Sequence, residues 1–405
     1  MKGLTRFISC TLFVWVVLTP ISSAAQERTA RELVDLILRE GPQARAIRAA
    51  VEVVRQEQAA RRMLPNPTVW YTRESAGFTE FLQIDQSLPA FGLRSALQRA
   101  GVAAVEAAEA ESGVALAALR AEAITAIARF AAESTRIAEA ERAVREIEKL
   151  VEILAIRERE GEGSKYDRRR AEQETHEARL AHVSATAAAA EARAGVEALL
   201  PGGVGLGAVS WDQPPAAVVT LEMLTARGTE QRSELRALER AANRFRLESE
   251  AARRARGVTP SFVAGLKRAD DSGDRQAGYI AGAGLSIPLF DRGDREAARC
   301  NAEAARAMAA HAEVAARVRA EIAGAAAVLE LRRRALESFA EASVAGEEIR
   351  TIADAAYQDG AITILELLDA YRTAARARAR LIDLRLDAAL ALIALQRATG
   401  DSTWQ

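Results

Sequence analysis

Residues 88–91 read Leu-Pro-Ala-Phe, and residues 287–290 read Ile-Pro-Leu-Phe, 199 positions further along the chain. The same offset relates Gly161 to Gly360. Motifs that return in the same order at one fixed spacing indicate that a structural unit is present twice. This duplication decides the fold, because each copy must then contain the same succession of helices and strands.

The duplication divides the chain into two predicted structural repeats. The first covers residues 26–200 and the second covers residues 231–405. Residues 201–230 are rich in glycine and proline, which predicts an irregular link between the repeats. Each repeat is predicted to contain a helix, two short strands, a very long helix, a turn and a second long helix.

Long helices dominate the predicted fold. No proline occurs in residues 90–200 or 289–405, and aromatic residues make up only 5% of the chain. In the first of these windows apolar residues recur every seven positions, which predicts a seam between supercoiled helices. The residues of this seam are Phe130, Ile137, Val144 and Val151. The fold class is therefore mainly α with a small β part.

The short strands before each long helix have one apolar and one polar side. In residues 82–88, Leu82, Ile84 and Leu88 alternate with polar residues that include Gln83 and Asp85. Alternation of this kind, apolar outward and polar inward, is required of a transmembrane barrel, whose lumen Gln83 and Asp85 would line. A hairpin on a soluble helical protein is the alternative.

The number of strands predicts an oligomer. Residues 67–74 and 260–267 are the predicted partner strands, connected by residues 75–80 and by a polar loop at 268–276. Four strands cannot close a barrel, which needs about eight. Three chains would supply twelve.

The N-terminus and the charge balance indicate a secreted protein. Residues 1–25 combine basic, apolar and small-residue segments in the order of a cleavable signal peptide. Without them the chain has 53 basic and 56 acidic residues, a formal charge of −3, which argues against nucleic acid as a partner. The remainder contains no long uncharged apolar run, which argues against membrane-spanning helices. Cys300 is its single cysteine, so an intrachain disulfide is excluded there.

Four motifs carry a resemblance to a known family. They are Leu64-Pro65-Asn66-Pro67, the strand-to-helix segments 86–94 and 285–293, and the turn at 357–370, which reads Tyr-Gln-Asp-Gly-Ala-Ile-Thr-Ile-Leu-Glu-Leu-Leu-Asp-Ala. In duplicate, in order and at matching spacing, they resemble the TolC-like outer-membrane efflux proteins over nearly the whole chain after the signal.

The resemblance implies a homotrimer with a twelve-stranded β-barrel in outer-membrane lipid and a twelve-helix α-barrel that extends into the periplasm. It implies a passive channel of a tripartite efflux system, with a periplasmic adaptor and an inner-membrane pump as partners. No cofactor is implied.

The resemblance also assigns roles to residues at the two helix-to-helix turns. It implies that the turns contact the adaptor and that residues beside them surround a periplasmic aperture. The adaptor-contact residues are Gly161, Gly163, Ser164, Gly360, Ala361, Ile362 and Thr363, and the aperture residues are Asp167, Tyr357, Glu366 and Asp369. Glu366 and Asp369 share a helix face, so three copies would gather their charges in a field that favours cations.

Helix capping is an alternative explanation for two of these carboxylates. Ser164 with Asp167, and Thr363 with Glu366, have the spacing of a capping box. The sequence leaves both interpretations open. Ile362 departs from the family's best-known gate, which has a basic residue there, so a salt bridge from this position is absent.

No constellation of residues indicates catalysis or metal binding. His176 and His182 are six positions apart and fall on different helix faces, and His311 is isolated. We therefore predict no catalytic, cofactor or metal site. The alternative function is a soluble periplasmic coiled-coil adaptor or structural protein, which would explain the heptads but not the paired strands.

Overall fold

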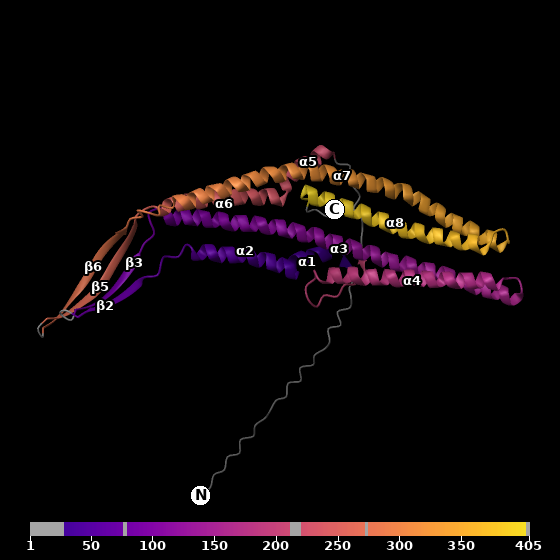
Figure 1. The fold of residues 1–405 in the computed structure, drawn as a ribbon, viewed down its shortest axis with the longest axis horizontal. Helices are drawn as coiled ribbons and strands as arrows, with labels where there is room; N and C mark the ends of the chain where they lie inside the picture. Colours follow the sequence, from indigo (N-terminus) through magenta and orange to yellow (C-terminus); the bar gives the residue numbers. More distant parts are fainter. Residues whose placement is uncertain (1–27, 76–78, 211–219, 272–273, 402–405) are drawn as a thin grey trace, which may run out of the picture.

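The computed structural model describes residues 28–75, 79–210, 220–271 and 274–401. The predicted signal peptide lies outside the described residues. The molecule is elongated, with a β-sheet at one end, two long helical hairpins at the other and shorter helices along the middle (Figure 1).

The two halves of the chain contain the same elements in the same order. The first half has α1 (Ala30–Glu40), α2 (Pro42–Ala60), β2 (Thr68–Glu74), β3 (Thr79–Ser87), α3 (Leu93–Glu160) and α4 (Lys165–Glu197). The second half has α5 (Leu221–Gln231), α6 (Ser233–Ala255), β5 (Thr259–Asp271), β6 (Asp274–Ser286), α7 (Asp294–Gln358) and α8 (Ile364–Thr399). The predicted fold class of each chain, mainly α with duplicated helical hairpins and four strands in one sheet, is confirmed. A short parallel pair, β1 (Arg28–Thr29) with β4 (Val209–Ser210), is additional.

The first helix of each half is split in two, which the sequence analysis did not predict. In the first half the break lies at Gly41, and Pro42 begins α2. Proline is tolerated there because the N–H group that it lacks would have no partner within the helix at this position. In the second half the break lies at Arg232, a buried arginine that pairs with Glu234 at 2.8 Å and Glu321 at 2.9 Å. Because α5 occupies 221–231, the irregular link is shorter than predicted, and its residues 211–219 lie outside the described residues.

The four-stranded sheet is antiparallel, in the order β2-β3-β5-β6. The polar loop predicted at 268–276 is wrong, because Arg268 pairs with Ala277 and Asp270 with Arg275. Polar side chains are compatible with strand pairing, because the pairing itself is made by backbone hydrogen bonds. Here the opposed side chains of Asp270 and Arg275 also form an ion pair at 3.7 Å. The hairpin of the second half is consequently longer than that of the first, and β2 and β6 form the two edges.

The two longest helices, α3 and α7, each follow a glycine. The residues before α3 and α7, Gly92 and Gly293, have φ of 76° and 71°, a left-handed conformation that other residues rarely adopt. They are 201 positions apart, so two extra residues, Asp291 and Arg292, precede α7. With 68 residues, α3 reaches roughly 100 Å at 1.5 Å per residue.

The helices pack in one layer, and the core between them is thin. Among the described elements α3 contacts α4 and α8, and α8 contacts α7, which leaves α4 and α7 at the outer edges. The largest core cluster lies near the middle, where Leu33 and Ile37 of α1 meet Leu119 and Ile127 of α3 and Val196 of α4. Each such buried side chain stabilises the fold by about 1.5 to 3 kcal/mol. No helix in the described part of the chain is both long enough and apolar enough to cross a membrane.

Candidate functional site

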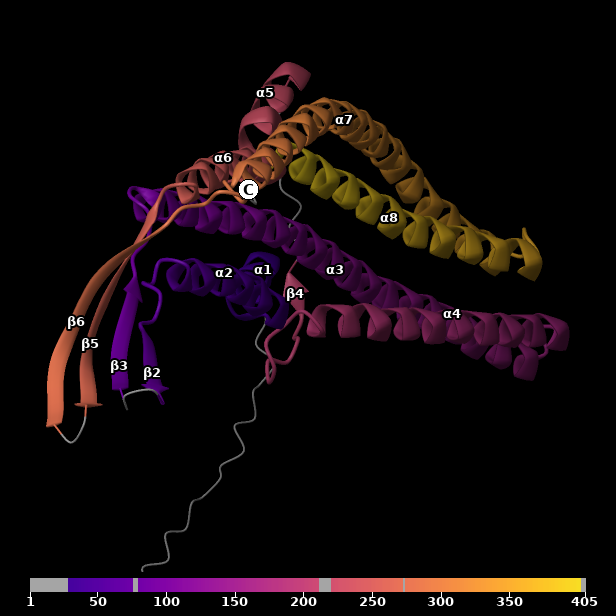
Figure 2. The same cartoon turned by 60° about the vertical axis from the view of Figure 1, so that its left-hand side comes forward.

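The two helix-to-helix turns lie together at the end of the molecule far from the sheet (Figures 1 and 2). Gly161 ends α3 with φ of 82°, and Gly360 follows α7 with φ of 73°. Both glycines are exposed, as are Ser164, Ala361 and Thr363. Gly163 is half-buried, because its backbone lies against Arg157. The residues predicted to contact an adaptor therefore form two adjacent, mostly exposed turns.

The structure separates the two capping interpretations. The Glu366 side chain accepts a hydrogen bond from the Thr363 N–H at 2.7 Å, and the Glu366 N–H donates to Thr363 Oγ1 at 3.4 Å, so this pair is a capping box. These bonds from Thr363 hold the pKa of Glu366 below its usual range. At the other turn the Ser164 hydroxyl accepts a hydrogen bond from the Tyr166 N–H, so the alternative of a capping box between Ser164 and Asp167 does not apply.

Asp167 instead connects the two hairpins. The Tyr357 hydroxyl on α7 donates a hydrogen bond to Asp167 Oδ2 on α4 at 3.1 Å. The Arg157 guanidinium lies 5.6 Å from the centre of the Tyr357 ring. Burial and then the charge of Asp167 raise the pKa of Tyr357 to about 12, so the hydroxyl keeps its proton at neutral pH. Two of the four predicted aperture residues are therefore in direct contact.

The other predicted tip residues have different surroundings. Asp369 is exposed on α8, one turn beyond Glu366. Ile362 is partly buried against an apolar cluster that includes Leu150 and Leu154 of α3 and Leu367 and Leu368 of α8. Hydrophobic packing therefore occupies the position at which the best-known gate of the TolC-like family has a basic residue.

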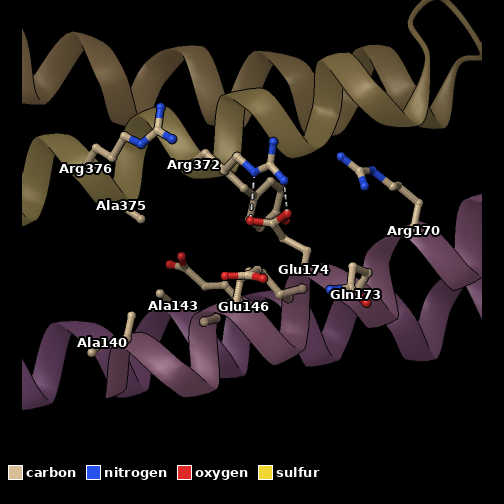
Figure 3. Close-up of a pocket in the computed structure, with 14 residues that line it drawn as sticks. Ala140, Ala143, Glu146, Arg170, Gln173, Glu174, Arg372, Ala375 and Arg376 are labelled. Carbon is tan, nitrogen blue, oxygen red and sulfur yellow. Dashed lines mark hydrogen bonds and ion pairs between the residues drawn. The ribbon is translucent and has the colours of Figure 1, made fainter. Parts of the chain in front are cut away.

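An ion pair that the sequence did not indicate joins the hairpins about two helical turns further from the tip than Asp167. Arg372 Nε of α8 donates to Glu174 Oε1 of α4 at 2.8 Å, and a second contact joins Arg372 Nη2 to Glu174 Oε2 (Figure 3). Glu174 is only 7% exposed, and its hydrogen bond raises the pKa of Arg372. The pair borders a cavity of about 640 Å³ between α3, α4 and α8. No local motif marks these two residues, because the contact depends on how separate hairpins pack.

A larger ion-pair network lies between α3, α7 and α8. Arg378 of α8 is 12% exposed in its side chain and contacts Glu139 at 3.1 Å, Glu146 at 2.8 Å and Glu347 at 2.8 Å. Burial alone would raise the pKa of Glu347, but Arg350 and Arg378 outweigh it and hold this pKa below its usual range. We call Arg378 and its three carboxylates the hairpin network.

At the opposite end, one face of the sheet is apolar and exposed. The register places Ile84 between Val69 and Ala264, and Leu82 between Tyr71 and Leu266. The large apolar side chains of this face are all exposed in the single chain; they are Val69, Tyr71, Leu82, Ile84, Phe262, Leu266, Tyr279 and Leu285. A folded chain in water rarely exposes so continuous an apolar surface.

The opposite face contains the residues predicted to line a lumen. Gln83 lies between Trp70 and Gly265, and Asp85 lies between Thr68 and Val263. Asp85 Oδ1 is buried and has no hydrogen-bond partner within the described residues. The two residues share a face, as predicted, and that face also contains the exposed Trp70.

Few side chains in the described ranges suit metal or nucleophile chemistry. No group of three histidine, cysteine or acidic residues that could hold a metal ion occurs there. His311 lies 3.6 Å from Glu239 alone. Cys300 is buried in α7, and burial followed by the charge of Glu296 raises the pKa of its thiol, which disfavours the reactive thiolate.

Comparisons with known proteins agree with this geometry. Residues 227–401 match the family of outer membrane efflux proteins. No curated protein sequence matches the chain. Among solved structures, a membrane protein from Pseudomonas aeruginosa is 22% identical with a TM-score of 0.74, covering 92% of this chain and 90% of that one.

Two further solved structures are outer-membrane proteins by their descriptions. The CmeC outer membrane channel of Campylobacter jejuni is 13% identical with a TM-score of 0.73, covering 92% of this chain and 85% of that one. VceC, an outer membrane protein of Vibrio cholerae, is 19% identical with a TM-score of 0.67, covering 92% and 96%. Residues 227–401 thus match the outer membrane efflux proteins, the chain has the fold of these solved structures, and the resemblance found in the sequence is confirmed.

Proposed function

We propose that this chain is the outer-membrane channel subunit of a tripartite efflux system, in which three copies form a passive duct. The observation that carries the proposal is the exposed apolar face of a sheet that also has two open edges. The fold and the family match support it.

The sheet supports insertion into lipid. Its apolar face, with Ile84 and Leu285, suits hydrocarbon, while the face with Gln83 and Asp85 suits an aqueous lumen. Unpaired edges at β2 and β6 cannot persist in lipid, where no water satisfies backbone groups. Pairing β6 of one copy with β2 of the next removes both edges and closes a barrel of twelve strands.

The helical edges support the same assembly. Exposed apolar residues lie on α4, where they include Leu180 and Val183, and on α7, where they include Leu331 and Val344. A neighbouring copy that packs α4 against α7 covers both sets and closes a tube of twelve helices. In this proposal the sheet spans the outer membrane, and the tube extends from it into the periplasm.

The tip turns are the proposed contact for a periplasmic adaptor, which in turn connects to an inner-membrane pump. Exposed Gly161, Ser164, Gly360, Ala361 and Thr363, with Gly163 and Ile362 beside them, present the surface for docking. Asp167, Tyr357, Glu366 and Asp369 are proposed to surround the aperture. The Tyr357–Asp167 bond would hold the two hairpins of one copy together in the closed state.

We further propose that the two halves of the chain are copies of one ancestral unit, with the first copy at residues 26–200. Because α5 (Leu221–Gln231) corresponds in order to α1, we extend the second copy from the predicted 231–405 to include α5, which shortens the link accordingly.

The proposal is tested by purifying the secreted chain from membranes in mild detergent. Mass measurement should give three chains per particle, and planar bilayers should show conductance steps. A folded monomer in bilayers without conductance contradicts the channel, and recovery of the protein in the soluble periplasmic fraction favours a coiled-coil adaptor or structural protein.

A further inference from the structure

A cluster of arginines surrounds the junction between the sheet and the helices. The ends of α2 and α6 and the starts of α3 and α7 meet at the base of the sheet (Figures 1 and 2). Arg61 near the end of α2 lies 3.8 Å from Glu248 of α6, and Arg256 lies 3.9 Å from Asp294 of α7. We name the arginines of these segments the junction collar: Arg61, Arg62, Arg94, Arg253, Arg254, Arg256, Arg292 and Arg295.

Positive charge is concentrated at this junction. The segments 61–62, 91–95, 252–256 and 291–296 contain these eight arginines and only three carboxylates, which are Asp291, Asp294 and Glu296. The whole chain is almost balanced, with 55 basic and 56 acidic residues. The excess is therefore local, and the proposed trimer would repeat it three times around one axis.

Most arginines of the junction collar have no carboxylate partner. Five of them are exposed and form no ion pair within the described residues; they are Arg94, Arg253, Arg254, Arg292 and Arg295. A Cβ placed on Gly92 would lie 3.4 Å from Arg254 Nη1, so this guanidinium lies close to the start of α3, which carries Arg94. Like charges that gather without a counterion repel each other, so an anion bound there would stabilise the junction.

Exposed apolar side chains lie among these arginines. Phe91 is 91% exposed and Phe290 is 99% exposed, and Ile287 and Leu289 beside them are also exposed. They adjoin the apolar face of the sheet, since Phe91 and Phe290 follow β3 and β6 within a few residues. Aromatic and basic side chains at the border of an apolar surface are typical of proteins at the membrane–water boundary.

We infer that the junction collar binds the phosphate groups of anionic phospholipids in the periplasm-facing leaflet of the outer membrane. This inference rests on the proposed function, because the sheet must span the membrane for its base to meet that leaflet. The guanidinium groups supply forked donors that match phosphate oxygens, and the phenylalanines extend among the acyl chains. Charge complementarity selects an anionic lipid over a zwitterionic one.

The test compares lipid binding by the full-length protein purified in mild detergent. Native mass spectrometry measures the binding of phosphatidylglycerol and of phosphatidylcholine to the parent and to a triple variant, Arg94→Gln, Arg254→Gln and Arg292→Gln. Each arginine near an anionic surface contributes about fivefold in affinity, so the triple variant should lose on the order of a hundredfold for phosphatidylglycerol. Lysine at the same three positions should keep most of the preference, since the charge is retained.

A matched control removes the same charge elsewhere. Arg31→Gln, Arg45→Gln and Arg319→Gln change three exposed arginines of α1, α2 and α7 that also form no ion pair in the described residues and lie far from the junction. This control should bind phosphatidylglycerol like the parent. Circular dichroism at 222 nm verifies that both triple variants retain the parent's helix content.

Four outcomes overturn the inference. An equal loss of phosphatidylglycerol affinity in the junction variant and in the control shows a general charge effect. Displacement of the lipid by inorganic phosphate at the same concentration shows a site for free anions. A parent that conducts in neutral phosphatidylcholine bilayers but has no preference for phosphatidylglycerol overturns the junction collar alone. A parent that inserts into neither type of bilayer overturns the proposed function and this inference with it.

Discussion

Arg378→Met tests whether the hairpin network holds the two hairpins together. The substitution keeps the apolar length of the side chain but removes the cation that contacts Glu139, Glu146 and Glu347. Removing one partner from a fully buried ion pair costs about 3 to 5 kcal/mol. Because the three carboxylates are partly exposed and Arg142 and Arg350 remain nearby, we expect about 3 kcal/mol, on the order of a hundredfold in a local opening equilibrium.

Native-state hydrogen exchange measures this opening where it occurs. Amides of α3, α7 and α8 around the network should exchange on the order of a hundredfold faster in the variant, while those of the sheet should not change. Arg334→Met is the control. Arg334 is exposed and, among the described residues, forms an ion pair only with Glu330 one turn away, a contact of under about 1 kcal/mol.

The effect of the substitution on hydrogen exchange should also depend on pH. In the parent the pKa of Glu347 is lowered, so its contribution is present above the unfolded pKa and is lost as pH falls through the folded value. In the variant the three carboxylates repel one another, and their protonation at low pH removes this repulsion. The difference in hydrogen-exchange protection between the parent and the variant should therefore become smaller below about pH 5. A change confined to the amides next to residue 378, or one no larger than that of the control, would refute the role of the network.

Three further predictions concern the sheet, the tip and the aperture. Ile84→Arg places charge on the apolar face and should cost about 2 to 4 kcal/mol near the middle of the membrane, whereas Gln83→Arg should be tolerated; equal loss of heat-stable oligomer on gels would reject the assignment of faces. Gly360→Val strains a left-handed residue at the exposed turn and should abolish efflux while assembly persists, so unchanged drug or metal resistance in cells would argue against docking there. Glu366→Gln keeps the acceptor of the capping box and, with Asp369→Asn, should lower cation preference in single-channel recordings; identical selectivity would make both residues ordinary parts of a helix start.

The sequence predicted the elements that depend on local chemistry. Proline-free windows and the glycines at 161 and 360 located both hairpins, because proline and glycine act on the backbone at their own positions. The alternation around Gln83 and Ile84 correctly predicted that these residues lie on opposite faces of the sheet, because successive side chains of a strand point to opposite sides. The Thr363–Glu366 capping box is likewise a contact within one turn.

Features that depend on contacts between distant segments were not predictable. Asp167 has the spacing of a cap, yet it accepts the Tyr357 hydroxyl from another hairpin. Glu174, which is buried, pairs with Arg372 of another hairpin, and neither residue belongs to a motif that the sequence analysis identified. The extent of β5 and β6 was missed because charged residues at 268–276 suggested a loop, whereas the backbone ladder between the strands continues.

The lengths of the two hairpins are coupled. Helices α3 and α4 have 68 and 33 residues and α7 and α8 have 65 and 36, so the hairpins contain equal numbers of helical residues despite different divisions. Deleting one heptad from both arms of a single hairpin would lower its turn by about 10 Å relative to the other and separate Tyr357 from Asp167. Insertions and deletions in this chain are therefore expected to accumulate only in matched sets across all four arms, and the reach of the protein should vary among relatives in steps of whole heptads.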